Sequence, residues 1–286
     1  MFATVFLGKG IITVDRMRRN RLMKKLPIEN QIKKLLKDND LSDMEEDILE
    51  TLIPCIAITP VEADDLPVGT SKFGGFPDLP EGEEFPRWKG RPLSFIAQYN
   101  LAELKQTGFS SPLPDQGMLY FFCGTAMDIP VWEEKGEPGG WSVFYIDTEP
   151  SRLRPVPFPE DLPREGFFEE RKMKLSVEKT LPEVEFIEGM DDVYFDLMDQ
   201  LYQLEERESG YHQAFGDPFQ MEGDVFKECK ANSGNPSDDW VLLLQVDSDE
   251  EMGMIWGDLG MLYFCIARED LRKKRFDRSW LVMQSH

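Results

Sequence analysis

One short sequence near the middle of the chain returns near its end, and this repeat constrains the fold more than any other feature. Residues Gly117–Phe122 read Gly-Met-Leu-Tyr-Phe-Phe, and Gly260–Phe264 repeats the first five. A glycine followed by an unbroken apolar run is typical of a strand that is buried on both faces of a sheet. The repeat therefore predicts two equivalent strands at the centre of a sheet.

The repeat is longer than the strand itself. Each copy follows a Gly and Pro turn and an apolar strand ending in Gln and Asn or Asp, at Gly74–Pro77 with Leu93–Asn100, and at Gly216–Pro218 with Val241–Asp247. Two long copies indicate halves packed face to face rather than a solenoid. We therefore predict a mainly β fold (β-rich α+β) of antiparallel, roll-like sheets. Its two quasi-equivalent duplicated halves, about 71–124 and 212–267, would enclose a ligand cleft.

Two helices are predicted near the N-terminus. Apolar residues follow helical spacing after Pro27, which suits the first turn of a helix. The segment Ser42–Glu45 reads as a capping box that opens a second helix. This helix is expected to stop at Pro54, with an inner face made of Ile48, Leu49, Leu52 and Ile53.

Other elements are predicted along the rest of the chain. One inserted helix is expected from Asp191 to about Glu208, where apolar residues form a single stripe. The stretch Ser71–Pro80 is too rich in Gly and Pro for regular structure and is expected to pack across a sheet. Further strands are predicted at Cys55–Thr59, Trp141–Ile146, Met173–Val177 and Trp280–Met283, and a short helix at Arg268–Phe276.

The N-terminal segment differs in composition from the remainder. The first 25 residues contain seven basic residues and one acidic residue, whereas the whole chain has a formal net charge of -22. Residues 1–22 are therefore predicted to be a disordered or non-native extension, with native translation starting at Met23. Residues 23–286 are predicted to form a single domain.

The charge and the cysteines indicate the compartment and the partners. An acidic surface repels phosphate backbones, so we expect a basic protein partner and no nucleic acid; the alternative is that acidity only keeps the chain soluble. No stretch reaches the roughly 20 apolar residues of a membrane helix. The four cysteines form no CxxC pair, and a secretory signal is not recognisable. These features predict a reduced, cytoplasmic protein, which we expect to be a monomer.

The sequence carries no familiar catalytic motif. The hydrolase, zinc-protease, phosphate-loop and dinucleotide signatures are not found. The two histidines, His212 and His286, complete no zinc spacing, so no metal and no cofactor are expected. The acidic run Asp247–Glu251 lacks the glycine of a calcium loop, and Ser71 with Lys72 lacks the order of a phosphate loop.

Six side chains are the candidate ligand-binding residues: His212, Gln220, Gln98, Gln245, Trp256 and Asp258. His212 is either a general base or ligand contact, because imidazole titrates near neutrality, or a residue that fixes its loop by bonding the backbone. Gln98 and Gln245 occupy equivalent places, and either tie the halves together or face a ligand.

The last two candidates lie just before the second repeated strand. Trp256 and Asp258 would place an aromatic platform and a carboxylate at the mouth of a cleft. Alternatively, Asp258 caps the turn that leads into Gly260, which is a common role for Asp before Gly. Both interpretations stay open at the level of sequence.

These segments together resemble the YwqG-like family of uncharacterised bacterial proteins. The resemblance spans roughly residues 26–284 and rests on the two repeated strands, Gln98, and the segments Gly74–Pro77, His212–Gln220, Leu244–Asp247 and Trp256–Gly260. It implies a mainly β, roll-like fold with peripheral helices and brings no established activity. The resemblance also implies relatives that lie near secreted-toxin systems, and with them an immunity role as an expectation.

Two function hypotheses follow. The first is a non-enzymatic cytoplasmic binding or protein-interaction module, suggested by the acidic surface and the aromatic loops, in one form an acidic immunity-type protein. The alternative is a small-molecule-binding or hydrolytic enzyme that uses His212 and Asp258 in a cleft between the halves. It requires these two side chains to approach each other across a pocket.

Overall fold

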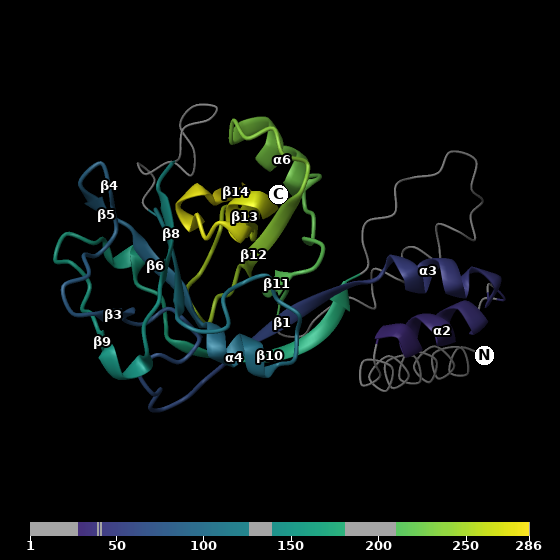
Figure 1. Ribbon diagram of the computed structural model, residues 1–286, viewed down its shortest axis with the longest axis horizontal. Helices are drawn as coiled ribbons and strands as arrows, with labels where there is room; N and C mark the ends of the chain where they lie inside the picture. Colours follow the sequence, from purple (N-terminus) through teal and green to yellow (C-terminus); the bar gives the residue numbers. More distant parts are fainter. Residues whose placement is uncertain (1–27, 39, 41, 126–138, 181–209, 286) are drawn as a thin grey trace, which may run out of the picture. The chain divides into compact units, whose positions relative to one another are not determined.

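The computed structural model describes residues 28–38, 40, 42–125, 139–180 and 210–285 (Figure 1). The chain divides into two compact units. One comprises the chain up to Ile53 and the segment that begins at Glu178, and the other comprises Pro54–Val177 and the chain from Arg207. The predicted N-terminal extension and the helix predicted from Asp191 lie outside the described residues.

The first unit contains the two predicted N-terminal helices. Helix α2 (Ile28–Asp38) buries Ile32 and Leu36 completely, which confirms the predicted spacing. A short 3-10 turn, η1 (Ser42–Met44), leads into α3 (Glu45–Thr51).

The predicted end of this second helix was wrong. Helix α3 stops at Thr51, and Ile53 and Pro54 already belong to strand β1 (Ile53–Val61). A proline disfavours helical backbone at the residue before it, so the chain becomes extended ahead of Pro54 rather than at it. Ile53 is therefore 39% exposed instead of lying on the inner face of a helix.

The second unit is built on one ten-stranded sheet with antiparallel pairing, which confirms the mainly β fold class. Strand β1 lies inside this sheet. The order is β14 (Trp280–Gln284), β13 (Met261–Ala267), β12 (Trp240–Asp247), β11 (Gln213–Phe215), β1, β10 (Arg171–Thr180), β2 (Lys72–Phe73), β6 (Ser94–Asn100), β7 (Met118–Cys123) and β8 (Trp141–Ile146).

The two end strands of this sheet approach each other. Trp141 in β8 donates from Nε1 to the carbonyl of Ser279 at 3.1 Å. Its ring also meets the ring of Trp280 in β14 edge to face, with centroids 5.0 Å apart. The sheet is therefore nearly closed.

The repeated strands lie where the sequence predicts. Strands β7 and β13 each lie between two partners, and every residue of both is buried. The two strands contact each other through the rings of Phe121 in β7 and Phe264 in β13, whose centroids are 5.2 Å apart. Tyr99 also donates its hydroxyl to the carbonyl of Leu243 at 3.3 Å. Around these contacts the two repeats share one hydrophobic core.

The stretch Ser71–Pro80, predicted to be irregular, contains two short strands. Strand β2 joins the main sheet, and β3 (Asp78–Pro80) pairs with β9 (Leu153–Pro155). The prediction of irregular structure was wrong. The turns formed by Gly and Pro leave two or three residues between them, and these are enough to pair as short strands.

The remaining elements are short. The sequence pattern missed helices α4 (Leu101–Gln106) and α6 (Val225–Asn232). The others are the hairpin β4 (Arg87–Trp88) with β5 (Arg91–Pro92), the turns η2 (Pro150–Arg152) and η3 (Arg164–Gly166), and α7 (Arg268–Arg272) followed by η4 (Phe276–Arg278). No helix among the described segments combines the length and the apolar character needed to cross a membrane.

Candidate functional site

Gln98 and Gln245 each use their buried amide to hold a loop against the sheet. Gln98 accepts from the N–H of Asp78 at 2.9 Å and donates to the carbonyl of Thr70 at 2.9 Å. Gln245 accepts from the N–H of Phe219 at 2.9 Å and donates to the carbonyl of Tyr211. Both amides are thus occupied by loops of their own half, and a ligand role for them stays a prediction.

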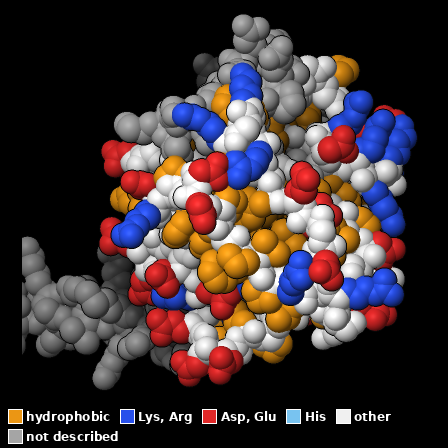
Figure 2. Space-filling view, turned by 90° about the vertical axis from the view of Figure 1, so that its left-hand side faces the viewer, with side chains coloured by type: hydrophobic (Ala, Val, Ile, Leu, Met, Phe, Trp, Pro, Cys, Tyr) orange, Lys and Arg blue, Asp and Glu red, His pale blue; other side chains and the backbone are white. Residues whose placement is uncertain are grey.

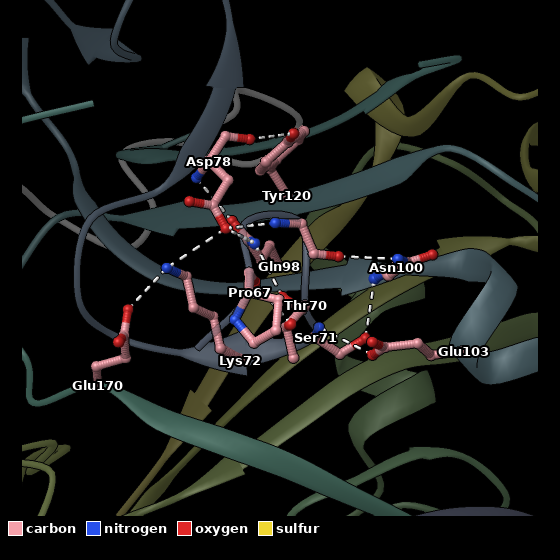
Figure 3. A network of polar contacts seen from close by, with 11 residues as sticks. Pro67, Thr70, Ser71, Lys72, Asp78, Gln98, Asn100, Glu103, Tyr120 and Glu170 are labelled. Atoms are coloured by element: carbon pink, nitrogen blue, oxygen red, sulfur yellow. Dashed lines mark hydrogen bonds and ion pairs between the residues drawn. The ribbon is translucent and has the colours of Figure 1, made fainter. Parts of the chain in front are cut away.

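A buried ionic network surrounds Gln98 (Figure 3). The amine of Lys72 lies 2.7 Å from Glu170 Oε2 and 3.5 Å from Asp78 Oδ2. The same Asp78 oxygen accepts from the N–H of Gly69 at 2.9 Å and from Gln98 Nε2 at 2.7 Å. The side chains of Lys72 and Asp78 are 5% and 2% exposed, whereas that of Glu170 is 38% exposed. Glu170 therefore connects the network to solvent.

Lys72 and Asp78 of this network belong to the first repeat, and Glu170 lies between the two repeats in the sequence. Lys72 pairs with Gln98 in the sheet register, and the position that pairs with Gln245 holds the neutral Gln213. The amine of Lys72 faces two carboxylates, so the arrangement around it is that of an ion pair rather than of an anion-holding loop.

His212 is buried, and its ring hydrogen-bonds the backbone. Nδ1 accepts from the N–H of Asp247 at 3.1 Å, and Nε2 lies 3.9 Å from Asp249 Oδ2. A neutral imidazole accepts at one nitrogen and donates at the other, so the proton sits on Nε2 and faces Asp249. A general base needs its unprotonated nitrogen to face a substrate, and here that nitrogen faces the backbone. This geometry favours the role in which His212 fixes its loop.

Because of its contact with His212, the ionised carboxylate of Asp249 makes a contribution to stability that depends on pH. The side chain of His212 lowers the pKa of Asp249, burial opposes this shift, and the N–H of Met252 lowers the pKa further. A carboxyl group whose folded pKa is depressed stabilises the protein above its unfolded pKa, and this stabilisation is lost as the pH falls through the folded pKa.

We therefore expect Asp249→Asn to lower the free energy of unfolding by about 0.5–1.5 kcal/mol at pH 7 and to have a smaller effect at pH 3. Urea unfolding at several pH values between 3 and 7 measures this difference. Asp258→Asn, on an exposed turn, is the matched control and should change stability little at any of these pH values. An equal loss at pH 7 and pH 3 would contradict the assignment to the ionised carboxyl group.

Trp256, Asp258 and Gln220 lie in different environments. Trp256 is 5% exposed and meets the ring of Phe168 edge to face at 5.7 Å, so its ring belongs to the core. Asp258 lies on an exposed turn, and the carboxylate that faces His212 is that of Asp249. Gln220 is half-buried beside Phe219, whose N–H binds Gln245. Their roles as ligand contacts stay predictions.

A group of exposed aromatic residues is a feature of this unit that buried packing does not explain. Phe76 and Phe167 are 43% and 42% exposed, and the half-buried Phe158 lies between them. Phe158 stacks on Phe167 with centroids 4.3 Å apart and meets Phe76 edge to face at 4.9 Å. We call these three residues the aromatic patch. Figure 2 shows hydrophobic side chains gathered on the face that carries β3, β4, β5 and β9, with charged groups around them.

A double-glycine turn places Phe76 in this patch. Gly74 and Gly75 have φ angles of 56° and 66°, which residues other than glycine rarely adopt. A Cβ on Gly74 would lie 2.3 Å from the carbonyl oxygen of Glu169, so the two backbones approach closely. Gly75 also donates to the carbonyl of Phe168 at 2.9 Å. The turn therefore holds Phe76 beside the segment that carries Phe167.

Comparison with known proteins identifies the family. Residues 71–285 match a family model described as a domain of unknown function (DUF1963). The chain belongs to the DUF1963 family. No curated protein matches it. The DUF1963 region begins just before β2 and ends just after β14, so it contains the ionic network and the aromatic patch.

Sequence reasoning missed two features of the DUF1963 region. The partners Lys72 and Glu170 are 98 positions apart, and no local pattern connects them. Phe158 and Phe167 lie in a proline-rich stretch for which no element is predicted above, although its aromatic residues are a usable signal. Of the described residues, no three His, Cys, Asp or Glu side chains come together as a metal site.

Proposed function

We propose that this DUF1963 chain is a non-enzymatic protein-interaction module, and that the aromatic patch is its binding face. The observation that carries this proposal is the contact of three phenylalanine rings at the surface, two of them more than two-fifths exposed. Exposing such rings costs free energy in water, and contiguous exposed apolar groups commonly mark interaction sites. The buried ionic network around Gln98 then serves to hold the loops that present the rings.

A basic protein is the proposed partner. The formal charge of -22 attracts positively charged molecules over distances of about 10 Å or less at ordinary salt. In its most specific form, the proposal is an acidic immunity-type protein that neutralises a basic toxin in the cytoplasm. A catalytic site on His212 receives less support, because the unprotonated nitrogen of its ring faces the backbone.

We also infer that the chain is YwqG-like and arose by internal duplication. Two sets of equivalent bonds support the duplication. The hydroxyls of Tyr120 and Tyr263 donate to the carbonyls of Asp78 and Phe219, whose N–H groups bind Gln98 and Gln245. The N–H groups of Asn100 and Asp247 donate to the side chains of Ser71 and His212. Both repeats also carry an irregularity in strand pairing, at Phe95/Ala97 and at Leu242/Leu244.

A capture experiment tests the proposed binding face. The wild-type chain and a Phe76→Ser/Phe167→Ser variant are immobilised and exposed to a native cell extract at low and high salt. Val177→Ser/Leu259→Ser is the matched control, because these two apolar side chains are 48% and 57% exposed and lie outside the patch.

We expect one basic protein to be retained by the wild type and by the control at low salt, and to be lost from the patch variant. Coexpression of the captured protein with each variant then shows whether the chain neutralises its activity. Equal retention by all three chains would place the interaction elsewhere. Retention of a small molecule instead of a protein would favour a ligand site.

A further inference from the structure

The rings of the aromatic patch present faces that suit a cation. Phe158 covers one face of the Phe167 ring with centroids 4.3 Å apart, and the residue Phe167 is still 42% exposed. Phe76 contacts Phe158 edge to face and is 43% exposed. The face of an aromatic ring carries negative charge density and attracts ammonium and guanidinium groups. The same side of the unit already holds one such contact, since the amine of Lys89 lies 4.4 Å from the centre of the Trp88 ring.

Carboxylates flank the patch residues in the sequence. Glu165 and Glu169 are exposed and lie two residues before and after Phe167. Glu170 lies against the turn that carries Phe76, because a Cβ on Gly75 would be 2.5 Å from Glu170 Oε2.

The charge of the segment 158–170 is predominantly negative. It contains five acidic residues and a single basic residue, Arg164. Two of the five are in ion pairs, Asp161 with Arg87 and Glu170 with Lys72, each at 2.7 Å. Glu165 and Glu169, two positions from Phe167 in the sequence, are exposed. The patch thus combines apolar ring faces with an excess of carboxylates.

We propose that the aromatic patch binds arginine side chains of the partner, an inference that rests on the proposed function. A guanidinium group is planar, stacks on aromatic rings and donates two parallel hydrogen bonds to a carboxylate. One arginine can therefore cover Phe167 and reach Glu165 or Glu169. A lysine ammonium is a compact charge that is more strongly hydrated and stacks less well. The same carboxylates repel an anionic membrane surface, which makes a lipid the poorer occupant.

Fluorescent peptides test this inference directly. Three eight-residue probes alternate serine with arginine, with lysine or with citrulline, which keeps the planar group and removes the charge. Fluorescence anisotropy at 50 and 300 mM salt gives the affinity of the wild-type chain for each probe. We expect the arginine probe to bind roughly three to ten times more tightly than the lysine probe, and the citrulline probe to bind weakest.

Substitutions locate the site. Phe167→Ala is expected to weaken binding of the arginine probe roughly tenfold and to remove its advantage over the lysine probe. Glu165→Gln/Glu169→Gln should weaken binding and reduce its dependence on salt. Leu259→Ala and Glu222→Gln, both exposed and outside the patch, are the matched controls and should leave binding unchanged. The Glu variants keep the test valid if Phe167→Ala does not fold.

Each outcome supports or overturns the inference. Equal affinity for the arginine and lysine probes would show general charge attraction and overturn it. So would binding that is insensitive to Phe167→Ala in a folded variant, or failure of all three probes to bind. If the probes fail while the capture experiment still loses its protein in the Phe76→Ser/Phe167→Ser variant, the proposed function stands and only the arginine inference fails. If neither the peptide experiment nor the capture experiment gives its expected result, both the arginine inference and the proposed function are overturned.

Discussion

Lys72→Ala is expected to lower the free energy of unfolding by about 3–5 kcal/mol. The substitution leaves the carboxylate of Asp78, whose side chain is 2% exposed, without its cation. Removing one partner of a buried ion pair costs far more than the pair contributes, because the remaining charge stays desolvated. The remaining donors to Asp78, Gly69 N–H and the Gln98 amide, are neutral and compensate only in part.

Urea unfolding at pH 7 measures this effect. Lys172→Ala is the matched control, because Lys172 lies opposite Lys72 in the pairing of β10 with β2 and is exposed. It should change stability by no more than about 0.5 kcal/mol. A neutral Asp78→Asn change keeps the size of the side chain and should cost less than Lys72→Ala. Similar small losses for Lys72→Ala and Lys172→Ala would show that the buried pair does not stabilise the fold.

Loss of the buried amides is the second large effect. Gln98→Leu removes the acceptor for Asp78 N–H and the donor to Thr70 and to the Asp78 carboxylate. Gln245→Leu removes one acceptor and one donor. Each buried polar group left without a partner costs about 1–3 kcal/mol, so we expect a loss of about 3 kcal/mol or more for Gln98→Leu and about 2 kcal/mol for Gln245→Leu.

Hydrogen exchange distinguishes this cause from a simple packing defect. The amide protons of Asp78 and Phe219 should lose protection selectively in the corresponding variants. The exposed Gln116 provides the control, and Gln116→Leu should leave stability and both amides unchanged. Uniform loss of protection along the chain, with no larger effect at Asp78 or Phe219, would contradict the assigned role of the amides.

The sequence predicts the centre of this fold better than its periphery. Strands β7 and β13 are recognisable because burial on both faces requires an unbroken apolar run, and β8 has the predicted bounds. Strand β10 is less regular than its alternating sequence suggests, since Met173 is buried and Val177 is 48% exposed. Strand β2 escapes prediction because two residues between turns carry no periodicity.

The candidate site is predictable only in part, for a different reason. The importance of Gln98 and Gln245 follows from their repeated position, although their partners do not. The pairing of Lys72 with Glu170 depends on β10 lying beside β2, which is a long-range property of the sheet. The aromatic patch likewise depends on how the turn at Gly74 and Gly75 meets Phe168, and local patterning contains no information on that contact.

Because of β1, the region matched by the family model is shorter than the part of the chain that forms the sheet. The DUF1963 match starts at residue 71, yet Ile53–Val61 lies inside the sheet, between β11 and β10. Its backbone pairs with β11, and the N–H of Ile58 donates to the carbonyl of His212 at 2.9 Å. A recombinant fragment cut at the family boundary would therefore have a strand-wide gap in its sheet, with two unsatisfied edges open to pairing with other chains. A fragment of this chain meant to fold should therefore retain the strand that precedes the matched region.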